Sequence, residues 1–264
     1  MHAPSTPPVS VTYGEGAEAA FVTITLDRPE RRNPLSRDTM QTMIDALESI
    51  AQTDARGIII ASTGPAFSAG HDFADMAGAD HAELRSLLQL CTRMMTLVQT
   101  VPQVVIAKVH ALATAAGCQL VATCDLAIAA DTASFALPGG KGGLFCHTPL
   151  VAVARNLSRK HALELSLTGD PIDAATAVGW GLINHAVPAD QLDARVTDLL
   201  RRATRGSAAS KAAGKHAYYT QIGLDQPTAY DFAVEVMAAN AVSHDGQEGI
   251  ASFLEKRSPN WRNR

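Results

Sequence analysis

Two short turns rich in small residues are the parts of this chain best suited to chemistry. Ala66–Asp72 follows the β-branched run Gly57–Ser62, and Ala113–Asp125 follows a second such run, Val104–Val109. Where a strand gives way to a loop or helix, backbone N–H groups remain free to point at a ligand. Two such turns facing one point would form an oxyanion hole, which stabilises negative charge developing on a substrate oxygen.

The elements around these turns alternate between strand and helix. Apolar spacing predicts a hairpin over residues 9–26, helices over 36–53 and 82–99, and strands over 57–62, 104–109 and 126–130. Such alternation is typical of parallel strands covered by helices. From Pro149 onward the pattern is mostly helical, with one short strand over 183–187. The sequence therefore predicts an α/β fold followed by a helical C-terminal region.

Composition and charge exclude several classes of protein. The 264 residues are 47% hydrophobic and 18% charged, and the net charge of −4 comes from interspersed acidic and basic residues. No basic face for nucleic acid is expected. No apolar run is long enough to cross a membrane, and the nine histidines show no metal-ligand spacing. We therefore expect no nucleic acid, membrane or metal partner.

The four cysteines indicate a compartment. Cys91, Cys118, Cys124 and Cys146 lie in apolar surroundings without a Cys-x-x-Cys pair. This pattern favours reduced core thiols over a disulfide or zinc framework. The first ten residues hold no apolar run typical of a signal peptide. The prediction is a cytoplasmic protein.

Several motifs in order along the chain resemble the enoyl-CoA hydratase/isomerase (crotonase) family. Arg28–Leu35 has the pattern Arg-Pro-x-x-x-Asn-x-Leu, Phe67–Asp72 has Phe-x-x-Gly-x-Asp, and Phe135–Pro138 has Phe-x-x-Pro. Gly246–Gly249 and Phe253–Arg257 are similar to the family's C-terminal signature. One such motif alone would be weak evidence of the resemblance, but the order and spacing of all of them over nearly the whole chain are strong evidence.

The resemblance implies a fold and an assembly. The family fold is a ββα-superhelix spiral, and its C-terminal helices build a homotrimer or a dimer of trimers. We therefore expect a flexible tail over residues 1–10 and one crotonase-like domain over 11–264. Within that domain the core spiral would cover about 11–200 and the C-terminal helical region about 201–264. Three segments resemble one subgroup in particular: Ala113–Leu120, Gly143–Cys146 and Asp245–Ile250.

The resemblance also implies the chemistry of the turns. Family members polarise the carbonyl of an acyl-CoA thioester, so that coenzyme A is part of the substrate and no separate cofactor is expected. Carried over residue by residue, the two oxyanion N–H groups are those of His71 and Ala116. Most relatives have Gly where Ala116 stands.

Both glutamates of the family hydratases are replaced here. One falls at Gln119 and the other at Gly139. Neither replacement can transfer a proton near neutral pH, and such groups contribute roughly 10²–10⁴-fold each. His147 is the candidate acid or base, since it lies where some family isomerases place an aspartate and an imidazole titrates near neutrality. The alternative is a loop histidine bonded to the backbone.

The remaining site residues are those expected to hold coenzyme A. In the family the early loop, here Glu30, Arg31 and Arg32, grips adenine and phosphates. The backbone around Ala69, Gly70 and Asp72 also contributes, and Phe253 and Lys256 would come from a neighbouring subunit. The two arginines could instead be a solvated surface turn. Asp72 is more consistent with anchoring the turn than with chemistry.

Three functions stay open at this point. The first is an enzyme that works through a thioester enolate, with isomerisation, decarboxylation or thioester cleavage favoured because they need fewer carboxylates than hydration. The second is a non-catalytic acyl-CoA-binding protein, which the loss of both glutamates favours. The third is a purely structural or regulatory oligomer, for which the sequence offers no positive signal.

Overall fold

A six-stranded sheet forms the centre of the fold. The computed structural model describes residues 7–263, and within this range the strand order is β1-β2-β3-β5-β7-β10. The strands are β1 (Val9–Tyr13), β2 (Phe21–Leu26), β3 (Gly57–Ser62), β5 (Val104–Val109), β7 (Leu126–Ala130) and β10 (His185–Val187). Strands β1 and β2 form an antiparallel hairpin, and the other pairs are parallel. The predicted α/β fold class is confirmed.

A second, smaller sheet was not predicted. Its order is β4 (Ala66–Ser68), β6 (Leu112–Thr114), β8 (Ser134–Ala136) and β9 (Ile172–Asp173). Strands of two or three residues are too short to show an alternating pattern, so only tertiary pairing reveals them. Strands β4 and β6 pair in parallel, and each of the two small-residue turns begins within one of them. This sheet therefore brings the turns to the same edge.

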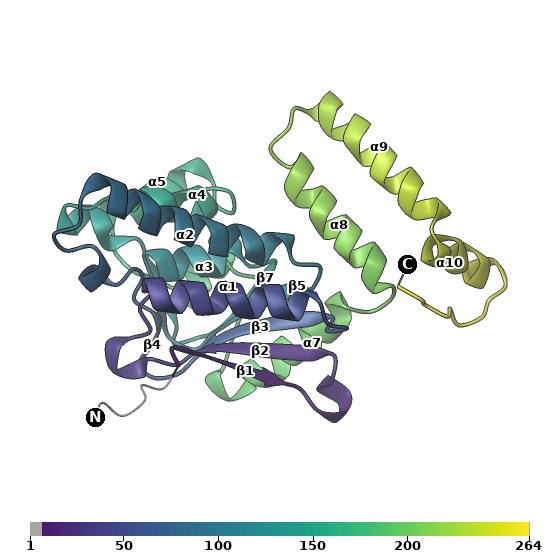
Figure 1. Ribbon diagram of the computed structural model, residues 1–264, viewed down its shortest axis with the longest axis horizontal. Helices are drawn as coiled ribbons and strands as arrows, with labels where there is room; N and C mark the ends of the chain where they lie inside the picture. Colours follow the sequence, from purple (N-terminus) through teal and green to yellow (C-terminus); the bar gives the residue numbers. More distant parts are fainter. Residues whose placement is uncertain (1–6, 264) are drawn as a thin grey trace.

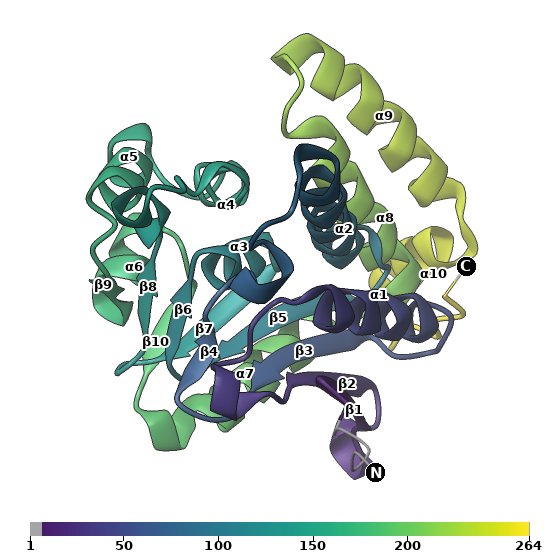
Figure 2. The ribbon, with the colours of Figure 1, turned by 60° about the vertical axis from the view of Figure 1, so that its left-hand side comes forward.

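Helices cover both faces of the large sheet. Helices α1 (Arg37–Ala51) and α2 (His81–Thr100) lie on one face and α7 (Leu192–Ala203) on the other, as Figure 2 shows. Ser36 caps α1 by accepting a hydrogen bond from the backbone N–H of Thr39. The helix buries its apolar stripe of Met40, Met43, Ile44, Leu47 and Ile50. Its predicted bounds are confirmed to within two residues.

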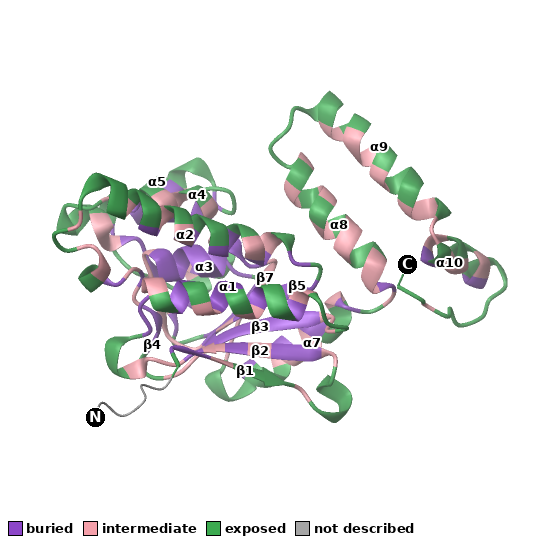
Figure 3. Ribbon diagram, in the orientation of Figure 1, coloured by how far each residue is buried: buried purple, intermediate pink, exposed green. Residues whose placement is uncertain are grey.

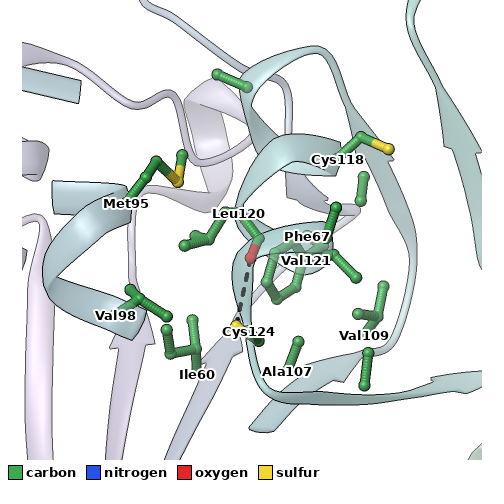
Figure 4. Close-up of a cluster of buried hydrophobic side chains, with 14 of the residues drawn as sticks. Ile60, Phe67, Met95, Val98, Ala107, Val109, Cys118, Leu120, Val121 and Cys124 are labelled. Carbon is green, nitrogen blue, oxygen red and sulfur yellow. Dashed lines mark hydrogen bonds between the residues drawn. The ribbon is translucent and has the colours of Figure 1, made fainter. Parts of the chain in front are cut away.

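The core beneath α2 includes α3 (Ala116–Thr123) and the cysteines. Figure 4 shows Phe67, Met95, Cys118 and Cys124 in one apolar cluster. All four cysteines are buried and unbridged, as predicted. Burial raises the pKa of the Cys91 and Cys118 thiols to about 12. These thiols are therefore protonated and unreactive near neutral pH.

The remaining elements form two groups at opposite ends of the molecule. Helices α4 (His147–Val153), α5 (Arg159–Thr168) and α6 (Ala174–Trp180) lie beside the small sheet. Helices α8 (Ala208–Gln221), α9 (Gln226–Val242) and α10 (His244–Leu254) extend away from the core (Figure 1). The short 3-10 helices are η1 (Gly16–Glu18), η2 (Pro29–Arg31), η3 (Phe73–Asp75), η4 (Pro138–Gly142) and η5 (Ala189–Gln191).

Helix α9 has no buried residue, whereas α3 is buried along its whole length (Figure 3). The side chains of Tyr230, Val234 and Met237 on α9 are 65%, 59% and 76% exposed. None of the helices in residues 7–263 combines the length and apolar character needed to span a membrane.

The two ends of the chain show further local detail. Helix α10 is capped by Ser243, which accepts a hydrogen bond from Gly246 N–H, although Asp245 and Glu248 also have the spacing of a helix cap. The carboxylate of Asp245 instead accepts hydrogen bonds from backbone groups of the C-terminal tail. Of the tail predicted over 1–10, residues 1–6 lie outside the described residues, and β1 already begins at Val9.

Candidate active site

The two small-residue turns approach each other closely at Gly70. Gly70 has φ +89°, and a Cβ atom there would lie 2.8 Å from the Cβ of Ala115 and 3.1 Å from the nitrogen of Ala116. Only glycine suits this position, because of both its conformation and its space. Ala116 is the first residue of α3, so its N–H has no acceptor within the helix. The turns thus approach each other at the residues that the sequence singled out.

Ala115, at the N-cap of α3, carries the strain of the second turn. Its backbone has φ 51° and ψ −120°, a region that residues other than glycine rarely adopt. Such a conformation costs on the order of 1–3 kcal/mol, and it persists only where the surrounding structure enforces it. The positive φ therefore falls at Ala115, one residue before Ala116.

Both turns open on one mostly apolar cavity of about 420 Å³. Met76, Leu88 and Phe145 supply much of its apolar wall. Of the predicted site residues, the cavity brings five together: Ala69, His71, Ala116, Gly139 and His147. No Asp, Glu, Lys or Arg is among the described residues that line it. The site is therefore a hydrophobic space with a few polar groups, two of them imidazoles.

The early loop is fastened to the first turn by hydrogen bonds. The side-chain amide of Asn33 donates to the carbonyls of Thr63 and Ala66 at 2.7 and 2.9 Å. The backbone N–H of Leu35 donates to the carbonyl of Gly70 at 2.7 Å. These bonds explain the asparagine at this position of the motif, since its amide links the early loop to the segment that leads into the first turn.

Arg31 and Asp72 form an ion pair across the same junction. A guanidinium nitrogen of Arg31 lies 2.8 Å from the carboxylate of Asp72, which also caps η3 through Ala74 N–H. Asp72 is 7% exposed. This geometry fits an anchoring carboxylate. Glu30, Arg31 and Arg32 are all exposed, so the loop remains accessible from solvent.

The two replaced glutamate positions differ in their surroundings. Gln119 is 6% exposed, and it is not among the residues that line the cavity. Its side-chain oxygen has no hydrogen-bond partner in the described part of the chain. At Gly139, a Cβ atom would collide with the carbonyl oxygen of Leu144 and would lie 2.8 Å from the sulfur of Cys146.

The loop after Gly139 is closed by its own hydrogen bonds. Gly139 N–H donates to the sulfur of Cys146 at 3.3 Å, and Leu144 N–H donates to the carbonyl of Gly139 at 2.9 Å. The carbonyl of Leu144 consequently occupies the space that any side chain at position 139 would need. The structure requires glycine here for reasons that the sequence did not reveal.

The side chain of His71 lies in the cavity wall. Burial lowers the pKa of its imidazole, although a hydrogen bond with the Leu35 backbone and the Asp75 carboxylate act in the opposite direction. The hydroxyl of Thr114 is buried and has no hydrogen-bond partner within residues 7–263. Sequence reasoning missed Thr114, because nothing in its local sequence distinguishes it from an ordinary strand residue.

His147 lies at the exposed edge of the same cavity. It is the first residue of α4, and its ring centroid lies 5.1 Å from that of Phe145. Phe253 and Lys256, in contrast, belong to the far end of the molecule. Phe253 is 82% exposed and lines a separate crevice of about 660 Å³ between α8 and α10. Within one chain these two residues do not join the cavity.

A second buried polar cluster joins α8 to the core. The ammonium of Lys215 lies 2.8 Å from the carboxylate of Asp125 and donates to the carbonyls of Val98 and Gln103 at 2.9 and 2.8 Å. The hydroxyl of Tyr219 donates to Asp125 at 2.8 Å. Burial raises the pKa of Tyr219, and the adjacent carboxylate adds to the effect. This cluster is a structural joint of the C-terminal helices.

The fold and the paired turns define a class of protein, and comparison with known families agrees. The chain matches the enoyl-CoA hydratase/isomerase family over residues 16–264 and belongs to that family.

The chain is also similar to individual members. It is 43% identical to the rat protein named enoyl-CoA hydratase domain-containing protein 3, mitochondrial, over 90% of this chain and 80% of that protein. The crystal structure of the human protein of the same name superposes with a TM-score of 0.91 at 39% identity, covering 96% and 100% of the two chains. An enoyl-CoA hydratase from Mycobacterium smegmatis gives a TM-score of 0.93 at 40% identity over 97% and 99%. The subgroup indicated by the three sequence segments is thereby confirmed.

The expected cytoplasmic location is contradicted by these relatives. The rat, mouse and human proteins are all named as mitochondrial, which points to mitochondria rather than the cytoplasm. The sequence argument rested on reduced cysteines. Buried thiols argue against an oxidising compartment, but they do not distinguish one reducing compartment from another.

Proposed function

We propose that this chain binds an acyl-CoA thioester and stabilises an enolate-like charge on the thioester oxygen with the backbone N–H groups of His71 and Ala116. The observation that carries the proposal is the contact of the two turns at Gly70, beside a cavity that both donor residues line. The first turn of α3 adds a favourable dipole at Ala116. A donor of this kind typically contributes about 3–4 kcal/mol to transition-state stabilisation.

The proposed reaction is not the two-glutamate hydration of an enoyl-CoA. The position of the first glutamate holds a buried amide, and the loop at Gly139 leaves no room for the second. Double-bond isomerisation, decarboxylation and thioester cleavage need fewer carboxylates. His147 is our candidate for the proton transfer, because its imidazole lies at the open edge of the cavity. No cofactor beyond the coenzyme A of the substrate is required.

Coenzyme A would lie along the loop Glu30–Arg32 and against the backbone of Ala69 and Gly70. Arg31 already pairs with Asp72, so Arg32 is the cation better placed to meet a phosphate. We further propose that Phe253 and Lys256 contribute from a neighbouring copy in a homotrimer or a dimer of trimers. The apolar side chains that α9 leaves uncovered favour such an assembly.

The test is mass spectrometry of an acyl-CoA panel incubated with the pure protein in heavy water. The panel contains saturated, 2-enoyl, 3-enoyl and malonyl-type thioesters. Deuterium exchange, a shifted double bond, loss of CO₂ or free CoA would each identify a reaction class, and a His147→Ala variant should lose that turnover. Rapid water addition would contradict the proposed loss of hydration, and a panel that does not bind at all would refute the proposal.

The second candidate is an acyl-CoA-binding protein without catalysis. The closed loop at Gly139 favours it, because this loop removes a catalytic position rather than exchanging one acid for another. The same panel separates the two candidates. Binding without any chemical change in any member of the panel would establish the second and exclude the first.

A further inference from the structure

Two of the side chains that line the cavity have polar atoms that do not reach it. Both ring nitrogens of His71 and the hydroxyl of Thr114 have almost no accessible surface, although both residues line the cavity. The part of these side chains that a ligand can touch is therefore carbon. The other polar side chains of the lining are those of Cys146, His147 and Thr148, which are consecutive at the start of α4. Among the described residues, polar side-chain groups thus reach the cavity from one segment, and the rest of its wall is apolar.

Two large apolar side chains of the lining are exposed to solvent. Phe73 in η3 is 73% exposed and Leu144, in the loop before α4, is 51% exposed, yet both line the cavity. Since a residue that lines a cavity and is mostly exposed lies at its opening, these two side chains mark the mouth. Leu144 is held there by its backbone N–H, which donates to the carbonyl of Gly139 at 2.9 Å. Exposed apolar side chains that border a cavity are typical of a binding groove.

The size of the cavity limits how much of an acyl group it holds. Its volume of about 420 Å³ is towards the lower end of the range for ligand sites, roughly 300–1,000 Å³. A thioester held by the backbone N–H groups of His71 and Ala116 would itself fill part of this space. A longer acyl chain must then continue through the mouth, where it meets Phe73 and Leu144. Contact there removes apolar surface of the chain and of both side chains from water, which is favourable.

We propose that Phe73 and Leu144 cover the outer part of a hydrocarbon acyl chain, and that they make this site selective for acyl groups of octanoyl length or longer over short ones. This inference rests on the proposed function, because it assumes a thioester held by the backbone N–H groups of His71 and Ala116. Phe73 and Leu144 are then specificity residues, since they contact the chain and none of the reacting atoms.

Other roles of these two side chains would leave a different signature. If the arm of coenzyme A passed over Phe73 and Leu144, replacing them would weaken free CoA and every thioester by the same factor. If a second copy of the chain covered them, replacing them would change the mass of the assembly and leave the preference for acyl length as it was. A loss that grows with acyl length is the signature of the hydrocarbon chain.

The test is calorimetric binding of free CoA and of saturated thioesters, from acetyl-CoA to dodecanoyl-CoA, to the full chain below the concentration at which the ligands form micelles. Each fully buried methylene adds up to about fourfold in affinity, and a partly covered one adds less. We expect octanoyl-CoA to bind at least about tenfold more tightly than butanoyl-CoA. The ratio of the two dissociation constants should fall by about threefold in Phe73→Ser and in Leu144→Ser. It should persist in Phe73→Leu and Leu144→Met, which remain apolar.

The matched control is Leu167→Ser, which replaces a leucine on α5 that is 69% exposed and is not part of the cavity lining. This variant should keep the wild-type ratio. Equal affinity of the wild-type protein for short and long chains would overturn the inference while leaving the proposed function intact. A ratio that survives both Phe73→Ser and Leu144→Ser, or an equal loss for free CoA and all thioesters, would also overturn it. Failure of every thioester to bind would refute the inference and the proposed function together.

Discussion

The two buried polar clusters of this molecule are built in opposite ways. At the joint between α8 and the core, Lys215, Asp125 and Tyr219 satisfy one another and two backbone carbonyls. In the cavity wall, the hydroxyl of Thr114 is equally shielded from water but has no hydrogen-bond partner within the described residues. The first cluster satisfies its polar groups within the chain, whereas the second leaves a buried hydroxyl unpaired.

The difference separates a polar group that stabilises the fold from one that does not. A buried charge is tolerated where its partners are fixed in place, and it then holds two parts of a fold in one arrangement. A buried polar atom without a partner lowers stability. The joint therefore positions the C-terminal helices, whereas the hydroxyl in the cavity wall adds no such bond.

The largest expected effect is at the joint. Lys215→Met leaves Asp125 as a buried carboxylate without its counter-ion, and this typically costs about 3–5 kcal/mol. The free energy of unfolding from urea titration measures the loss. Lys211→Met removes an exposed ammonium from the same helix and should change stability by less than about 0.5 kcal/mol. Similar losses in the two variants would mean that the ion pair of Lys215 contributes little to the free energy of unfolding.

A matched pair of single-oxygen deletions compares the clusters directly. Tyr219→Phe removes the hydrogen bond to the Asp125 carboxylate and should lower the free energy of unfolding by about 1.5–3 kcal/mol. Thr114→Val removes a hydroxyl that has no partner in the described chain, so the ligand-free protein should lose less than about 0.5 kcal/mol or gain stability. A large loss in Thr114→Val would show that this hydroxyl is hydrogen-bonded in the folded protein.

The loop at Gly139 tests whether the cavity wall is rigid. In Gly139→Ala the added methyl group collides with Leu144, which should cost about 1–3 kcal/mol. Gly142→Ala in the same loop is the control, since a Cβ atom there meets no atom within 4 Å. Thermal unfolding of both variants checks the difference. Equal stability of the two would indicate that the loop moves readily enough to admit a side chain at 139.

The smallest effect is the pH dependence that His71 contributes. Because burial lowers its pKa, the unfolded chain binds more protons than the folded one below the ordinary value of about 6.5. Stability should therefore be full above that value and decline as pH falls from it towards the lowered pKa. His71→Gln should flatten this decline in urea titrations across the range. An unchanged decline in His71→Gln would show that His71 does not contribute to it.

How far the sequence predicted the site differs from residue to residue. The family motifs located the two turns, the early loop and the replaced glutamates, because these features are local patterns of residue type. The sequence showed that both glutamates are replaced, but not that position 139 requires glycine. That constraint comes from Leu144 and Cys146, which are near in sequence but act on position 139 only through their folded geometry.

Other parts of the site depend on contacts between distant segments. The small sheet escaped prediction because its strands have only two or three residues, so their pairing partners define them. The joint at Lys215 was not predicted for a similar reason. Its acidic partner, Asp125, lies 90 positions earlier in the chain. The absence of a partner for Thr114 is a property of its surroundings and has no sequence signal.

The sequence by itself determined the alternation of strands and helices, the family, and the residue types available for chemistry. Each of these follows from local spacing and composition, which the chain carries whether or not it is folded. Only the tertiary structure decided that Gly70 and Ala116 meet, that position 139 has no room for a side chain, and which buried polar atoms lack partners. Those properties depend on which atoms fill the space around a residue, and that space is created when distant segments pack together.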